Sequence, residues 1–153
     1  MVHFVGAGPG APDLITLRGA ELLAGGGLRH LCGQPGQPGA AGAGGAGLRH
    51  LQQRRDDAGA GACCHERNEA AHKTTVRLHT GDPCLYGAIR EQMDELDKLN
   101  ISYKVCPGVS SFCGAASALN LEYTLPGVSQ SVIITRMAGR TPVPERESIA
   151  SFA

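Results

Sequence analysis

Three glycine-containing loops in this sequence carry residues that could hold a small-molecule ligand. They are 6–10, Gly-Ala-Gly-Pro-Gly; 80–87, Thr-Gly-Asp-Pro-Cys-Leu-Tyr-Gly; and 107–111, Pro-Gly-Val-Ser-Ser. Glycines permit tight turns and leave room for a ligand beside the backbone. The first loop has the spacing Gly-x-Gly-x-Gly. Pro9 in the loop and Pro12 just after it lack the amide donors that a phosphate needs. A phosphate site is therefore disfavoured, and a plain turn is the alternative for this loop.

Other reactive side chains give weaker signals. His79 precedes the second loop and could titrate near neutral pH, although a histidine at a strand end is as often a structural hydrogen-bonding residue. No catalytic nucleophile is expected, because Cys84, Cys106 and Cys113 have no adjacent histidine or other base. No metal site is expected either, because the Cys-Cys-His triplet at 63–65 lacks the spaced pairs of a structural zinc site.

The elements that must position these loops are strands alternating with helices. Apolar patterns predict strands at 2–5, 74–79, 101–106 and 129–136, and helices at 14–23, 88–99 and 110–119. Such alternation indicates an α/β fold with a parallel sheet flanked by helices. Ligands of parallel sheets bind at the carboxyl ends of the strands, where all three loops fall.

Length and composition exclude several classes of protein. The 153 residues suffice for one ordinary domain, and 14 basic side chains balance 14 acidic ones, which argues against a nucleic-acid or anionic-membrane partner. No apolar run is long enough for a membrane span, and residues 1–6 lack the basic head of a signal peptide. We therefore expect a cytoplasmic protein whose six cysteines are reduced thiols.

The segment 16–75 differs in composition from both flanks. It contains no Val, Ile, Phe, Tyr, Met or Trp, so we do not expect it to supply β-strands to a core, and residues 24–62 hold 12 of the 22 glycines. One interpretation is a flexible linker. The other, which we favour, is that about residues 25–69 are translated out of frame and are disordered.

The genetic code allows a test of the second interpretation. Reading residues 28–38 one base later permits, with synonymous codons, Cys-Val-Ile-Tyr-Ala-Gly-Ser-Leu-Val-Asn-Pro, which is a buried strand and a loop. The same offset at 50–65 permits Ile-Tyr-Asn-Ser-Ala-Gly-Met-Thr-Leu-Glu-Gln-Val-Leu-Ala-Val-Met, a strand followed by a Thr-capped helix. It also accounts for the repeated Gly-Leu-Arg-His-Leu at 27–31 and 47–51.

Three motifs, in order, resemble those of the tetrapyrrole methylases. Residues 5–10 with Asp-Leu-Ile-Thr at 13–16 look like the N-terminal signature of that family, and 81–83 and 107–111 look like its two later loops. The resemblance implies methyl transfer from S-adenosylmethionine to a ring carbon of a corrin or porphyrin precursor.

Two longer stretches of sequence resemble one group of enzymes within this family. Residues 77–93 and 134–144 look most like the precorrin-4 or cobalt-precorrin-4 C11-methyltransferases of cobalamin biosynthesis, as does the offset translation. The likeness covers about residues 1–24 and 70–153. It implies two α/β domains with the methyl donor between them, of which 1–125 would be the N-terminal domain and 126–153 the start of the second.

The resemblance also implies site residues. Those expected to bind S-adenosylmethionine are Pro9, Thr80, Gly81, Asp82, Leu85, Ser110, Ser111 and Met137. The Asp82 carboxylate could hold a ribose hydroxyl or an amino group, and its alternative is a turn residue before Pro83. Arg136 and Arg140 are natural partners for the carboxylates of a tetrapyrrole substrate, and their alternative is solvated surface charge.

Several interpretations of function remain open. Attack of a ring carbon on the sulfonium methyl requires mainly positioning and exclusion of water, and the sequence does not identify a base beyond His79. The alternatives are another family member, such as a uroporphyrinogen-III or precorrin-2 methyltransferase, an inactive relic, or a binding module. Intact members are expected to be homodimers, whereas the oligomeric state here and any cobalt in the substrate are not readable.

Overall fold

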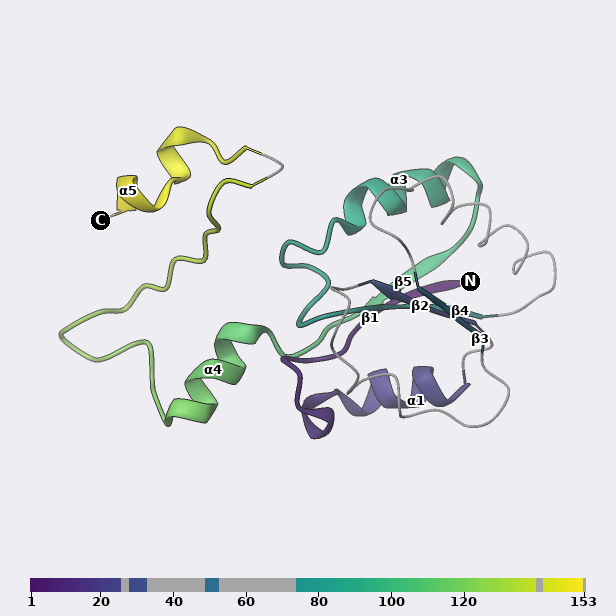
Figure 1. The fold of residues 1–153 in the computed structure, drawn as a ribbon, viewed down its shortest axis with the longest axis horizontal. Coiled ribbons are helices and arrows are strands. Elements are labelled where there is room, and N and C mark those ends of the chain that lie inside the picture. The colour runs from purple at the N-terminus through teal and green to yellow at the C-terminus, as the bar shows by residue number, and fades with distance from the viewer. Residues whose placement is uncertain (26–27, 33–48, 53–73, 140–141, 153) are drawn as a thin grey trace. The chain divides into compact units, whose positions relative to one another are not determined.

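The computed structural model describes residues 1–25, 28–32, 49–52, 74–139 and 142–152 (Figure 1). They divide into two compact units, Met1–Ala118 and Leu119–Ala153, which we describe separately. The domain boundary expected from the sequence, after residue 125, lies seven residues later than the boundary between these units. No helix within the described ranges is long and apolar enough to cross a membrane.

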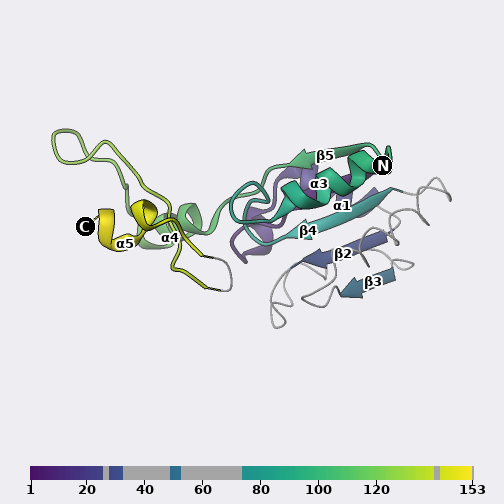
Figure 2. The same ribbon diagram turned by 90° about the horizontal axis from the view of Figure 1, so that it is seen from above.

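A five-stranded sheet forms the centre of the first unit. Its strands lie in the order β3-β2-β4-β1-β5, and every pairing is parallel. Figure 2 shows β3, β2 and β4 side by side. The strands are β1 Val2–Gly6, β2 Leu28–Cys32, β3 Arg49–Gln52, β4 Thr75–His79 and β5 Tyr103–Cys106. The α/β class and the parallel sheet predicted from the sequence are confirmed.

Helices cover both faces of the sheet. α1 (Leu17–Gly25) lies on one face and α3 (Ile89–Lys98) on the other (Figure 1). α4 (Ser111–Leu119) follows β5. Short helical turns, η1 Pro12–Leu14 and, in the second unit, η3 Glu145–Glu147 and α5 Ile149–Phe152, complete the helical elements of the described residues.

Alternating side chains of the strands divide the core into two clusters. On the α3 face, Val2 and Phe4 pack with residues of α3 and its C-terminal connection: Ile89, Leu96 and Ile101. On the α1 face, Val5 packs with Leu23 of α1 and with three residues of β4 and β5: Val76, Leu78 and Cys106. Each cluster follows the period of two expected of a strand buried on both faces.

The structure corrects the expectation that residues 16–75 supply no strands. β2 and β3 both lie in that segment, and β2 pairs with β3 on one side and with β4 on the other. Ladder hydrogen bonds come from the main chain, which explains how strands form without the usual strand-favouring residues. Both strands coincide with those of the offset translation, and residues 33–48 and 53–69 lie outside the described part of the chain.

The strand predicted at 129–136 is not formed. In the second unit an isolated bridge joins Leu125 to Ser129, and the residues that follow have no strand pairing. The apolar side chains of Val132, Ile133 and Ile134 are 42–59% exposed. The prediction was wrong because an apolar run forms a strand only beside a partner strand, and the described residues of this unit offer none.

Candidate functional site

The topology of the sheet singles out the carboxyl ends of β1 and β4. These strands are neighbours, yet the chain leaves β1 toward α1 on one face and leaves β4 toward α3 on the other (Figure 1). The loops that follow them therefore diverge, which is the arrangement that opens a ligand site at the carboxyl edge of a parallel sheet. The first two glycine loops lie at this point, and the third follows β5, the neighbour of β1.

Three glycines, one from each loop, bring the loops into backbone contact. A Cβ atom on Gly6 would lie 2.6 Å from Cα of Gly108 and 2.6 Å from the carbonyl oxygen of Gly81. A Cβ on Gly108 would lie 2.2 Å from the same Gly81 oxygen. Real Cβ atoms do not approach backbone this closely, so glycine is required at positions 6 and 108 by close packing.

Main-chain hydrogen bonds hold the first two loops together. The Gly81 N–H donates to the Gly8 carbonyl at 2.9 Å, and the Gly8 N–H donates to the Gly81 carbonyl at 3.3 Å. Gly8 and Gly81 have φ of +82° and +65°, which glycine adopts without strain. The Ala7 N–H donates to the His79 carbonyl at 2.8 Å, which extends the β1–β4 pairing into the loops.

Asp82 connects the second loop to the third. Its Oδ1 accepts a hydrogen bond of 2.7 Å from the Cys84 N–H, and its Oδ2 accepts one of 3.0 Å from the Gly108 N–H. The first bond is the turn interaction that the sequence analysis gave as the alternative role of this residue. The second bond crosses between loops, and the predicted contact of Asp82 with a methyl donor stays a prediction.

The other predicted donor-site residues of the first unit lie on the same loops. Pro9 packs on α4, where a Cβ on Gly114 would lie 2.6 Å from the proline ring. The Ser110 carbonyl accepts the Gly114 N–H at 3.1 Å, and Ser111 is the first residue of α4. Thr80 and Leu85 are exposed in the second loop.

The remaining predicted residues do not belong to this unit. Arg136 and Met137 lie in the second unit, where the Arg136 guanidinium donates to the carbonyls of Met137 at 3.4 Å and Pro142 at 3.1 Å. Arg140 lies outside the described residues. Their predicted roles toward donor and substrate stay predictions.

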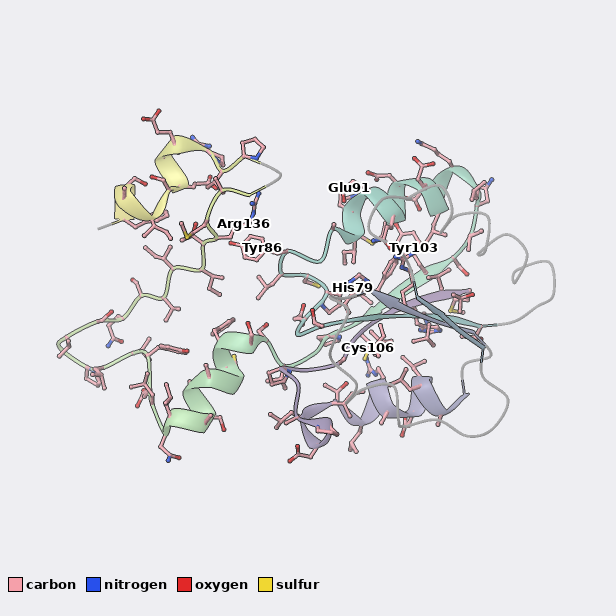
Figure 3. All side chains as sticks on the ribbon, in the orientation of Figure 1. His79, Tyr86, Glu91, Tyr103, Cys106 and Arg136 are labelled. Atoms are coloured by element: carbon pink, nitrogen blue, oxygen red, sulfur yellow. The ribbon has the colours of Figure 1, made fainter. Side chains whose placement is uncertain are left out.

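His79 is the last residue of β4, and its side chain is buried on the α3 face of the sheet (Figure 3). Its side chain is 4% exposed, and its ring lies 5.9 Å from that of Phe4. Burial, and then the charge of Arg77, lower the pKa of His79 from 6.5 to about 4. A base with so low a pKa accepts a proton poorly at neutral pH, which favours the structural alternative for this residue.

Two cysteines lie on or beside the loops of this site: Cys84 in the second loop and Cys106 at the end of β5. Partial burial, and then the hydrogen bond and charge of Asp82, raise the pKa of the Cys84 thiol. Cys106 is buried on the α1 face, with its sulfur 3.6 Å from Oγ1 of Thr16. The raised pKa of Cys84 disfavours its thiolate, which is the reactive form. The expectation that no cysteine acts as a nucleophile stays a prediction. The triplet at 63–65 lies outside the described residues, and within those described no three potential ligands gather as for a metal ion.

Sequence reasoning missed two residues beside the site. Thr16 accepts the Gly19 N–H at 3.1 Å as the cap of α1, and its hydroxyl lies 3.5 Å from the Pro107 carbonyl of the third loop. A threonine just before a helical pattern is a capping signal that could have found it. Tyr86 adopts a left-handed conformation with φ of 55°, and no sequence signal predicts this for tyrosine.

Comparisons with known proteins agree with this geometry. The family described as Tetrapyrrole (Corrin/Porphyrin) Methylases matches residues 49–153. The chain is 41% identical to the cobalt-precorrin-4 C(11)-methyltransferase of Methanocaldococcus jannaschii and 41% identical to the precorrin-4 C(11)-methyltransferase of Mycobacterium tuberculosis. Each comparison covers 99% of this chain but 59% and 61% of the relative, so the chain spans about 60% of their length.

Solved structures give the same result. That of a cobalamin biosynthetic enzyme, cobalt precorrin-4 methyltransferase, superposes with a TM-score of 0.91 at 36% identity and covers 99% of this chain and 63% of its own. The uroporphyrin-III C-methyltransferase of Thermus thermophilus superposes with a TM-score of 0.69 at 29% identity, over 82% of this chain and 55% of its own. From the matched motifs, the sheet and these similarities, the chain belongs to the tetrapyrrole (corrin/porphyrin) methylases.

Proposed function

We propose that this protein transfers a methyl group from S-adenosylmethionine to C11 of precorrin-4 or cobalt-precorrin-4. The observation that carries the proposal is the joining of three glycine loops at the β1–β4 switch point by backbone contacts of Gly6, Gly81 and Gly108. The relatives named for this reaction are 36–41% identical over nearly the whole chain, and they support the choice of substrate.

The residues of the first unit fit S-adenosylmethionine by their chemistry. The donor carries ribose hydroxyls and an ammonium group, which a carboxylate and hydroxyls can bind. Asp82, Thr80, Ser110 and Ser111 supply such groups at the loops. Gly81 presents backbone without a side chain, which leaves room for a ligand to approach. When bound there, the donor supplies an electrophilic methyl group.

In this mechanism the protein acts mainly by positioning. The loop contacts fix the three segments relative to one another before a ligand arrives, so little ordering entropy is lost on binding. Leu85, beside the polar groups, contributes an apolar surface that excludes water from the reacting centre. Arg136 and Arg140 would bind substrate carboxylates through paired N–H donors. A basic group that removes a proton after transfer is not assigned.

Methyl transfer itself tests the proposal. The chain is incubated with S-adenosylmethionine labelled in its methyl group and with precorrin-4 or cobalt-precorrin-4, and the corrinoid is analysed by mass spectrometry and NMR. We expect label at C11. The Gly25→Ala variant is a matched control because nothing lies within 4 Å of a Cβ at that position, whereas Gly108→Ala should lose transfer. Absence of label from both corrinoids would overturn the proposal.

A second candidate is methylation of uroporphyrinogen III. The uroporphyrin-III methyltransferase structure supports it with a TM-score of 0.69, against 0.91 for the precorrin-4 enzyme, so we rank it lower. The same labelling experiment with uroporphyrinogen III distinguishes the two. The inactive relic predicts no label with any of the three substrates.

The expectations about partners stay predictions. A tetrapyrrole is proposed as the substrate on the strength of the family. Homodimer formation and the absence of nucleic-acid or membrane partners rest on the resemblance and on the neutral charge of the sequence. Sedimentation velocity would test the dimer.

A further inference from the structure

Two residues at the end of the second loop and directly after it are left-handed without being glycine. Tyr86 has φ of 55° and Ala88 has φ of 49°, on either side of Gly87. A Cβ on Gly87 would lie 2.1 Å from the Pro83 carbonyl oxygen, so the loop closes tightly on Pro83 at this residue. The tight closure accounts for the unusual backbone of both neighbours.

Left-handed backbone is costly for a bulky residue and is retained where the side chain has a use. At position 88 the side chain is a single methyl group, whereas at position 86 it is a large aromatic ring. Glycine at 86 would adopt the same backbone without strain. The tyrosine therefore points to a function of the ring itself.

The side chain of Tyr86 is exposed and does not fill the core. Its side chain is 61% exposed, and its neighbour Leu85 is 41% exposed. The ring extends away from the sheet on the loop that follows β4 (Figure 3). This loop begins at the switch point, where Asp82 joins it to the third loop. An apolar and aromatic surface thus borders the polar groups of the proposed donor site.

We propose that the Tyr86 ring is a stacking surface for the tetrapyrrole macrocycle. The proposal rests on the proposed function, because it names the residue that receives the substrate beside the donor site. An unsaturated ring system presents a flat apolar face, and an exposed aromatic side chain binds such a face by stacking. In this proposal Asp82, Ser110 and Ser111 contact the methyl donor, whereas Tyr86 contacts the tetrapyrrole that accepts the methyl group.

Binding measurements on three variants test this inference. The probe is uroporphyrin, a flat porphyrin carboxylate, followed by fluorescence quenching, and S-adenosylhomocysteine is titrated separately by calorimetry. Tyr86→Gly removes the ring and relieves the backbone, so we expect uroporphyrin affinity to fall about tenfold, as for loss of one stacked aromatic. S-adenosylhomocysteine affinity and Tm should not fall. Tyr86→Phe should keep uroporphyrin affinity within about twofold, because the ring is preserved.

Ala88→Gly is the matched control, because it relieves the same kind of backbone strain without removing a ring. It should leave both affinities unchanged. Unchanged uroporphyrin affinity in Tyr86→Gly would overturn the inference, and so would a lowered Tm or a parallel loss of S-adenosylhomocysteine affinity, since either would mean that the ring holds the loop. If the parent chain binds neither uroporphyrin nor S-adenosylhomocysteine, both the proposed function and the inference about Tyr86 fail. If the parent chain binds both probes and Tyr86→Gly binds them equally well, only the inference about Tyr86 fails.

Discussion

The backbone N–H of Gly108 donates a hydrogen bond of 3.0 Å to Oδ2 of Asp82, a residue 26 positions earlier in the chain. The other carboxylate oxygen accepts the Cys84 N–H at 2.7 Å within its own loop. One side chain therefore fixes the turn after β4 and attaches that turn to the loop after β5. We regard Asp82 as the residue that keeps the proposed donor site assembled in the absence of ligand.

Replacing Asp82 should weaken both stability and donor binding. Asp82→Ala leaves the N–H groups of Cys84 and Gly108 without their acceptor, which should lower the free energy of unfolding by about 1–3 kcal/mol. Asp82→Asn keeps one acceptor oxygen and should lose about half as much. Urea denaturation measures stability, and calorimetry measures S-adenosylhomocysteine affinity. Full stability in Asp82→Ala together with lost binding would mean that Asp82 acts as a ligand and not as a connection between loops.

The close approach of the loops predicts a steric effect at position 108. In Gly108→Ala the new Cβ would meet the Gly81 carbonyl at 2.2 Å and Cα of Gly6 at 2.8 Å, so the loops must separate. We expect a loss of about 3 kcal/mol in the free energy of unfolding and weaker donor binding. The control Gly25→Ala places its methyl group in open space and should be neutral or slightly stabilising. Equal stability of the two variants would contradict the packing described here.

Burial of His79 predicts a dependence of stability on pH. The pKa of this residue is lowered to about 4 in the folded protein, against 6.5 for the unfolded chain, so the unfolded state binds more protons between these values. Stability is then fully present above about pH 6.5 and is lost as the pH falls toward 4, by roughly 3 kcal/mol. Urea denaturation at a series of pH values measures this loss.

The His79→Gln variant isolates the contribution of this histidine. The pKa of His3 is also lowered, by burial and then by the charges of Lys104 and the N-terminus, and it acts in the same direction. His79→Gln should therefore show a shallower decline between pH 6.5 and 4, with the decline due to His3 retained. Superimposable pH profiles for the parent and the variant would rule out a buried neutral His79.

The nucleotide sequence of codons 25–69 tests the offset translation. β2 lies between β3 and β4, and a strand inside a parallel sheet is covered on both faces, which calls for apolar residues. Residues 28–32 read Leu-Arg-His-Leu-Cys, whereas the offset translation reads Cys-Val-Ile-Tyr-Ala. We expect the codons to be those that permit the offset translation, and a chain with the frame restored to unfold at higher urea. Incompatible codons would mean that the segment, including β2 and β3, is translated in its own frame.

The sequence was most informative where local pattern and tertiary structure agree. The spacing of Ile89, Met93 and Leu96 predicted α3, and two of these residues are buried while Met93 packs against them. The motifs also predicted that the three loops gather at one edge, because parallel strands end together.

Features that depend on distant backbone were not predictable. The bond from Gly108 to Asp82 requires knowing that β5 lies two strands from β4, with β1 between them. The left-handed Tyr86 follows from the closure of Gly87 on Pro83 and not from any preference of tyrosine. The in-frame residues of β2 and β3 predicted no strands because their types do not favour strands, whereas main-chain pairing does not depend on residue type.

The central claim is that the loops after β1, β4 and β5 form one methyl-donor site. The most direct measurement is calorimetric titration of S-adenosylhomocysteine into the parent chain, Gly25→Ala and Gly108→Ala, each checked for folding by circular dichroism. We predict one site per chain, equal affinity in the parent and Gly25→Ala, and affinity at least about tenfold lower in Gly108→Ala, which corresponds to about 1.4 kcal/mol. Failure of the folded parent chain to bind, or equal affinity in all three, would contradict the claim.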